Sequence, residues 1–117
     1  MLVTRLYTGS DGESHFEDVD IELRDLGEIG SISELLPATG VVFRTTGPDY
    51  DYAWHNAPRR QYVVMLSGGD VEIEVGDGTV RRFSPGDVLL AEDTHGRGHV
   101  SRAVDGRERT SLFITLD

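Results

Sequence analysis

Short segments of alternating or β-branched residues dominate the chain, and glycine or proline interrupts them every few residues. The clearest segment is VEIEV, which begins at Val71, because its apolar side chains share one face and its glutamates the other. Asp77 and Gly78 follow and tolerate the positive φ of a tight turn, so we expect a hairpin that returns along TVRRF. Further predicted strands are VDIEL from Val19, VVFRTT from Val41, QYVVML from Gln61, DVLLA from Asp87, HVSRAV from His99 and TSLFITL from Thr110.

Only residues 31–36 have helical character, and this segment is short enough to be a capped turn or an edge strand. The pattern therefore predicts an all-β chain. Its 117 residues suffice for one domain with one core. Many short strands favour a small barrel or sandwich, because closure removes unpaired strand edges. An OB-like barrel, an Ig-like sandwich and a jelly roll all fit this pattern.

Composition excludes several function classes. The chain has no cysteine, so disulfides, thiolate metal sites and cysteine nucleophiles are absent. Its eleven basic residues are all arginines, so no lysine can form a Schiff base. A net charge of -10 would repel a phosphate backbone, and we expect no nucleic-acid partner. With neither an apolar run of the ~18 residues a membrane span needs nor a secretory signal, we expect a cytoplasmic protein and no membrane partner.

Residues 47–68 carry more polar chemistry than a structural strand needs. Gly47, His55, Gln61 and Gly68 are spaced in a way that resembles the first motif of the cupin superfamily, in which two histidines precede a glutamate and a glycine. Residues 81–99 resemble the second motif, which begins with Pro-Gly-Asp and ends in a histidine. The resemblance covers about residues 41–116. It implies a double-stranded β-helix, that is, a jelly-roll or cupin barrel, formed by the single domain 1–117.

The chain departs from the family pattern at two ligand positions. Ala57 stands where the second histidine of the first motif is expected, and Gln61 replaces the glutamate. The ligand set that the resemblance implies is then His55, Gln61 and His99, which would take a divalent metal such as Zn, Fe, Mn or Ni without compensating its charge. In a second interpretation the two histidines act as general acid and base in a metal-free pocket. In a third they are polar residues of the barrel mouth with no chemical role.

The second-motif histidine is either His95 or His99, and we favour His99. It begins the alternating segment HVSRAV and can be held on the inner face of a strand, whereas His95 lies in a polar segment that reads as a solvated loop.

Other side chains of the first motif are candidates for binding a small molecule. Gln61, Val63 and Met65 share one face of a strand, which we expect to line the barrel. Trp54 either walls the pocket or packs in the core. Arg59 and Arg60 point to opposite faces, so one of them, Arg59 in our prediction, can reach the cavity and bind a carboxylate or phosphate.

The N-terminal residues 1–40 are expected to pack on the barrel or on a dimer partner. The opening MLVTRLYT resembles the added strand through which small cupins dimerise, so we expect a homodimer. His15 and Glu17 either contribute to the site by folding over the barrel mouth or lie in a solvated loop.

The resemblance implies an enzyme that acts on a small, partly apolar carbonyl or hydroxy compound, of the isomerase, cyclase or oxygenase type. The alternative is a non-catalytic cupin that binds or senses a small molecule. Fold does not decide between the two. The paired histidines favour the enzyme, and the missing charged ligand favours the binding protein.

Overall fold

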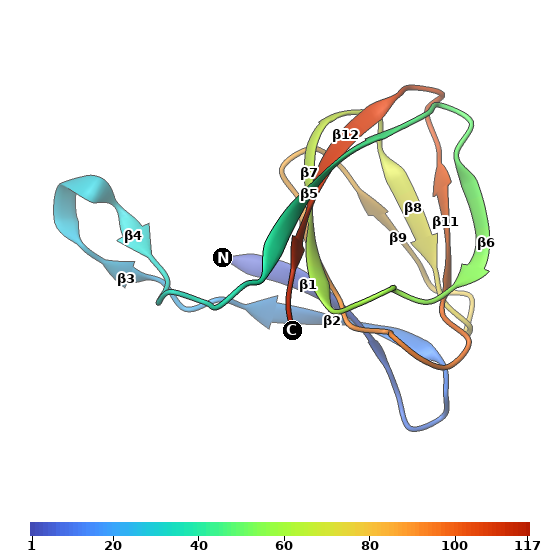
Figure 1. The fold of residues 1–117 in the computed structure, drawn as a ribbon, viewed down its shortest axis with the longest axis horizontal. Coiled ribbons are helices and arrows are strands. Elements are labelled where there is room, and N and C mark those ends of the chain that lie inside the picture. The colour runs from blue at the N-terminus through green and yellow to red at the C-terminus, as the bar shows by residue number, and fades with distance from the viewer.

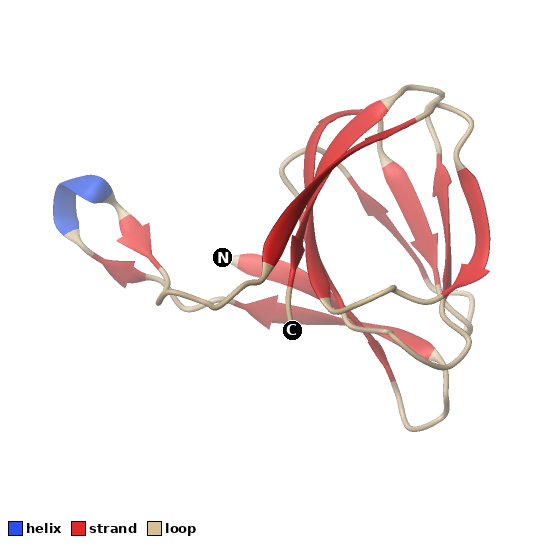
Figure 2. Cartoon of the chain, in the orientation of Figure 1, coloured by secondary structure: helices blue, strands red, loops and turns tan.

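The computed structural model describes all residues 1–117 and is almost entirely β-structure (Figure 1, Figure 2). Its one helical element is the single 3-10 turn η1 (Gly27–Ile29), so the prediction of an all-β chain is confirmed. The strands are β1 (Leu2–Thr8), β2 (Ser14–Asp20), β3 (Arg24–Asp25), β4 (Ser31–Ile32), β5 (Gly40–Thr46), β6 (Asp51–His55), β7 (Gln61–Gly68), β8 (Val71–Glu74), β9 (Val80–Phe83), β10 (Val88–Ala91), β11 (His99–Ala103) and β12 (Arg109–Thr115). The chain forms no helix with the length and hydropathy that a membrane-spanning helix needs.

Two sheets form the body of the molecule. The first has the strand order β2-β1-β10-β7-β12-β5 and the second the order β6-β11-β8-β9. Figure 1 shows the two sheets curving around a common interior, with β5, β7 and β12 facing β6, β8 and β11. Side chains from both sheets meet there in one hydrophobic core, made of Leu6, Val63, Met65, Val71, Ile73, Val75, Phe83 and Leu89.

The predicted hairpin is confirmed. Strands β8 and β9 pair antiparallel, with Val71 opposite Phe83, and the turn contains Gly78 at φ 87°. The backbone N–H of Thr79 donates to the Asp77 carboxylate at 2.9 Å, which fixes the turn. The apolar face of VEIEV is buried, as the alternation predicts.

Residues 54–66 do not form one strand, and the strand predicted from Gln61 begins at that residue. Strand β6 ends at His55 in the second sheet and β7 begins at Gln61 in the first. Residues 56–60 therefore pass from one sheet to the other, and Pro58, which has no N–H for a ladder, lies within this crossing. As a result, His55 and Gln61 reach the interior from opposite sheets.

The N-terminal segment differs from the prediction in two ways. Strand β1 lies between β2 and β10, so its edges are both paired, and the free edges of the first sheet belong to β2 and β5. The strand predicted from Val19 begins earlier, at Ser14, and ends at Asp20.

Residues 21–40 form an arm that projects from the body (Figure 1). In this arm β3 and β4 pair with each other, so the segment at residues 31–36 begins as a short strand and not as a helix. The radius of gyration, 14.7 Å, exceeds the value of about 13 Å for a compact domain of this length, as the projecting arm requires.

The core makes a direct stability prediction. Leu6 is fully buried and Leu2, on the same strand, is 72% exposed. Leu6→Ala is expected to lower the free energy of unfolding by about 2–5 kcal/mol, because it removes buried methyl groups and leaves a cavity. Leu2→Ala is expected to change it by no more than about 0.5 kcal/mol. Urea denaturation measures both; equal losses would contradict the placement of β1 over the core.

Candidate functional site

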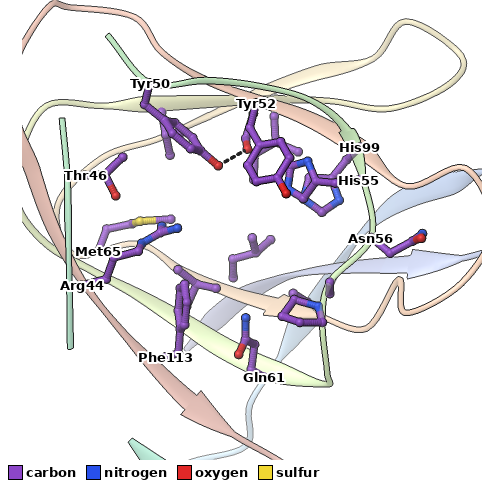
Figure 3. Close-up of a pocket in the computed structure, with 18 of the residues that line it drawn as sticks. Arg44, Thr46, Tyr50, Tyr52, His55, Asn56, Gln61, Met65, His99 and Phe113 are labelled. Atoms are coloured by element: carbon purple, nitrogen blue, oxygen red, sulfur yellow. Dashed lines mark hydrogen bonds between the residues drawn. The ribbon is translucent and has the colours of Figure 1, made fainter. Parts of the chain in front are cut away.

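A cavity of about 380 Å³ lies between the two sheets. Its wall is largely apolar, but histidines, arginines, tyrosines and Gln61 also face it. Figure 3 shows both histidines, Tyr50, Tyr52, Arg44 and Gln61 around the cavity. The lining residues are Arg44, Thr46, Tyr50, Tyr52, His55, Asn56, Ala57, Pro58, Gln61, Val63, Met65, Val71, Ile73, Leu89, Ala91, His99, Ser101, Arg109 and Phe113.

Two histidines meet on one side of the cavity. His55 ends β6 and His99 begins β11, and the two residues are direct partners in the antiparallel ladder. Their ring centroids lie 4.3 Å apart, and the Tyr52 ring stacks on His55 at 3.9 Å. Gly98 makes this approach possible, since it adopts φ 82° and a Cβ at its position would collide with the His55 carbonyl.

Behind His99 lies a buried carboxylate that the sequence interpretation assigned to a solvated loop. Asp93 is fully buried, and its Oδ2 accepts hydrogen bonds from His99 Nδ1 at 2.6 Å and from Ser14 Oγ at 2.7 Å. The backbone of the loop is held too, because Ala57 N–H donates to the Asp93 carbonyl. With Nδ1 of His99 committed to the carboxylate, its Nε2 has no partner within the protein. No feature of the sequence distinguishes Asp93 from the other acidic loop residues.

The His55 ring is neutral at physiological pH and has one defined tautomer. Burial lowers the pKa of His55, and the neighbouring His99 and Arg44 lower it further, against a raising effect from the Ala53 carbonyl and Asp93. His55 Nδ1 lies 2.8 Å from that carbonyl oxygen, which only accepts, so Nδ1 carries the proton. Nε2 of His55 is then the unprotonated nitrogen.

Arg44 and Arg109, which the sequence interpretation did not select, lie on the other side of the cavity; Figure 3 shows Arg44 there. Arg109 is 4% exposed, and burial together with the nearby Arg44 charge lowers its pKa to about 10. Burial also lowers the pKa of Arg44. In the sequence Arg44 stands between Phe43 and Thr45, and Arg109 follows Arg107 and Glu108 just before the predicted strand, but neither pattern says which face the side chain takes.

Gln61, Val63 and Met65 line the cavity and are all buried, as their alternation predicts. Trp54 does not: it is 38% exposed, and Arg97 stacks over its ring at 4.0 Å, so neither the core nor the pocket placement holds. Tyr52 and His55 both face the cavity although they are three residues apart, because the pairing of β6 with β11 shifts register between them. Trp54, next to His55, then takes the outer face.

Arg59 also lies outside the cavity wall. It is exposed and reaches the site only through a bond from its guanidinium to Gln61 Oε1, at 3.3 Å. The crossing at residues 56–60 belongs to no strand, so its side chains follow no alternation: Asn56, Ala57 and Pro58 line the cavity, whereas Arg59 is turned to the solvent. Arg60 pairs with Glu92 on the surface.

The remaining histidines lie away from the cavity. His95 is exposed in a loop, whereas His99 is buried on the inner wall. His15 lies on β2, not in a loop, and its ring contacts Asp11 at 2.9 Å. Glu17 faces Arg5 at 3.4 Å. Neither His15 nor Glu17 lines the cavity.

The residues do not fit the divalent metal site that the sequence suggests. No group of three or more histidine or acidic side chains is placed so that it could hold a metal ion. Figure 3 shows Gln61 on a different wall from His55 and His99, and its Oε1 faces the Arg59 guanidinium, which disfavours a cation there. Without Gln61, a divalent metal would have only the uncharged imidazoles of His55 and His99 as ligands.

No model of a known protein family matches this chain, and no curated protein matches it either.

The environment of His55 gives a pH prediction. We expect NMR titration to place its pKa below 6.5, and Arg44→Met to raise it, because the substitution removes a neighbouring positive charge. The variant Arg82→Met, at an exposed position, serves as the control and should leave the pKa of His55 unchanged.

The same pKa shift makes the stability depend on pH. Because the folded state disfavours the protonated ring, the contribution of His55 to the free energy of unfolding is present above pH 6.5 and falls as the pH drops below that value. A pKa at or above 6.5 would contradict the half-buried placement of His55.

Proposed function

We propose that this protein is an enzyme that moves a proton within a small, partly apolar carbonyl or hydroxy compound bound in the cavity. The observation that supports it best is the buried Asp93–His99 contact, with His55 beside it on the cavity wall. A carboxylate behind an imidazole fixes its tautomer and stabilises the imidazolium that forms when the ring takes a proton. The surrounding apolar wall matches the apolar part of the substrate.

In this proposal His99 is the general base. Its Nε2 takes a proton from the carbon next to the substrate carbonyl, and the electron pair of that C–H bond forms the enolate. His99 then holds the proton as an imidazolium next to Asp93 and returns it to a different atom of the enolate, so the reaction is an isomerisation with no change in composition. His55, which is neutral, accepts or shares the proton at the adjacent position. The same transfer can start a cyclisation.

A cupin-like double-stranded β-helix is the fold that we propose for the domain 1–117. The two facing sheets, the cavity between them and the tight turn at Pro85-Gly86-Asp87 support it. In that turn Gly86 has φ 96°, and Ser84 N–H donates to the Asp87 carboxylate at 2.8 Å.

A non-catalytic binding or sensing protein is the second candidate. The apolar wall supports it, since it could hold a small molecule without any contribution from the histidines. The two candidates differ in what His99 does: the enzyme needs its basic nitrogen, and the binding protein does not.

Proton transfer can be measured before the natural substrate is known. We expect the protein to incorporate solvent deuterium next to the carbonyl in some members of a panel of small oxo compounds, followed by NMR in D₂O. His99→Asn should slow this exchange at least about 100-fold, because it removes the base. The matched control is His95→Asn, in the exposed loop. This variant should catalyse the deuterium exchange at the same rate as the natural protein. Exchange in the panel at the same rate with and without His99 would contradict the enzyme.

We also propose a homodimer, with the arm as its contact surface. The arm, residues 21–40, leads directly into the free edge of β5 and carries large apolar side chains in water: Leu35 is 97% exposed and Ile29 73% exposed. On β5 itself Phe43 is 80% exposed. A second copy fits this surface, because a two-fold contact places each arm against the other copy's β5 and covers both apolar sets at once.

Light scattering tests the dimer. The natural protein is expected to have twice the monomer mass at micromolar concentration. The double variant Leu35→Glu/Phe43→Glu is expected to have the monomer mass, because a dimer of this variant would bury the new glutamate charges in its contact surface. Val80→Glu, at an exposed position of the second sheet, adds the same type of charge away from the arm and should remain dimeric. A monomeric natural protein would refute the dimer.

A further inference from the structure

We propose that Arg109, Arg44 and Thr46 form an oxyanion site, so the ligand of the cavity is a small acid whose carboxylate or phosphate binds there and whose apolar part points toward the histidines. This inference rests on the proposed function only in using the same cavity.

Arg109 is the first observation. Its guanidinium is buried, its Nε has no hydrogen-bond partner, and its only side-chain bond is from Nη1 to the Met65 sulfur at 3.6 Å. A thioether is a weak acceptor and carries no charge. A buried cation without a counterion is costly, so a fold that retains one is incomplete without an anion.

Thr46 is an independent second observation. It lies directly opposite Arg109 in the β5–β12 ladder, it is 8% exposed, and its hydroxyl oxygen is buried with no partner. Two adjacent side chains with unused donors therefore face the same cavity. Both lack an acceptor, and an oxyanion offers several acceptor positions at once.

Arg44 adds a second positive charge. Its Nε donates to Ser111 Oγ at 3.2 Å and its guanidinium lies 4.5 Å from the Phe113 ring centroid, so the side chain is held in place without a carboxylate. Burial first, and the nearby Arg44 charge second, lower the pKa of Arg109, so the two arginines repel each other at this side of the cavity. An anion between them would relieve that repulsion.

The rest of the chain makes this pair exceptional. The protein has 21 acidic residues, yet none of them lines the cavity. Seven other arginines form ion pairs with carboxylates, and the two that do not, Arg24 and Arg59, are exposed to water. The ion-paired arginines are Arg5, Arg60, Arg81, Arg82, Arg97, Arg102 and Arg107. A chain with abundant carboxylates thus leaves its two cavity arginines unpaired.

The position of the pair gives the ligand an orientation. Figure 3 shows Arg44 and Thr46 on one side of the cavity and His55 and His99 on the other, with Phe113 between them on the wall. A molecule whose acidic group binds the arginines therefore extends along an apolar wall toward the imidazoles. The substrate class is a small organic acid with an apolar middle and its reactive carbon at the far end.

Unreactive probes test the site without any turnover. Calorimetric titration compares benzoate and phenyl phosphate, which carry the two kinds of oxyanion, with the neutral, similarly shaped benzamide. We expect at least one anion to bind at least tenfold more tightly than benzamide, and the tighter anion identifies the group that the natural ligand carries. Benzamide binding as tightly as both anions, or no anion binding at all, would overturn the proposal.

Variants locate the binding. Arg109→Met and Arg44→Met are each expected to lower the affinity for the tighter-binding anion at least tenfold. The control variant Arg82→Met, at an exposed position, should keep the natural affinity. Thr46→Val, which keeps the shape of the side chain but removes the hydroxyl, should lower that affinity several-fold. Unchanged affinity in Arg109→Met and Arg44→Met would refute the site.

The variant His99→Asn separates this inference from the proposed enzyme, because it should leave the affinity for the anion unchanged. Anion binding by a protein that catalyses no proton exchange would refute the enzyme and leave the oxyanion site standing.

Discussion

A polar group that leaves water needs a partner, and this requirement shapes the inside of the molecule. The body consists of two sheets that surround one cavity, and several of the side chains on its walls are charged or strongly polar. On one side the requirement is met in part within the chain, because Asp93 Oδ2 accepts hydrogen bonds from both His99 and Ser14, whereas Asp93 Oδ1 is buried without a partner. On the other side it is not met, because Arg109 and Thr46 keep unused donors. The difference between the two sides is the basis of the function proposed here.

The chain path explains why both sides face one space. The crossing at residues 56–60 carries the chain from the second sheet to the first, so His55 and Gln61 approach the cavity from opposite walls. Gly98 then lets β11 come close enough to β6 for the two imidazoles to meet. Each step depends on a residue with special backbone properties, Pro58 in the crossing and Gly98 at the start of β11.

The sequence predicts the features that depend on local patterns. Alternation identifies the β8–β9 hairpin and the inward set Gln61, Val63 and Met65, because a strand has a period of two wherever one face is buried. Asp93, Arg44 and Arg109 could not be found in this way. Whether a charged residue faces the interior depends on the register between strands that are distant in sequence, such as β5 with β12.

The prediction for Trp54 fails for a related reason. A lone tryptophan is usually buried, but the register shift in the β6–β11 ladder turns His55 inward and leaves its neighbour Trp54 on the outer face, where Arg97 covers the ring. The metal site inferred from motif spacing needs His55 and Gln61 to reach one point, but the crossing places them on different walls of the cavity. Local spacing cannot reveal a change of sheet between two residues.

The most direct test of the account is a crystal structure of the protein grown with the tighter-binding of benzoate and phenyl phosphate. The account predicts the oxyanion within hydrogen-bond distance of Arg109 Nε and Thr46 Oγ1, with the ring along Phe113 on the side that leads to His55 and His99. A structure in which Arg109 pairs with a carboxylate of the protein itself, or in which the anion binds only outside the cavity, would contradict it.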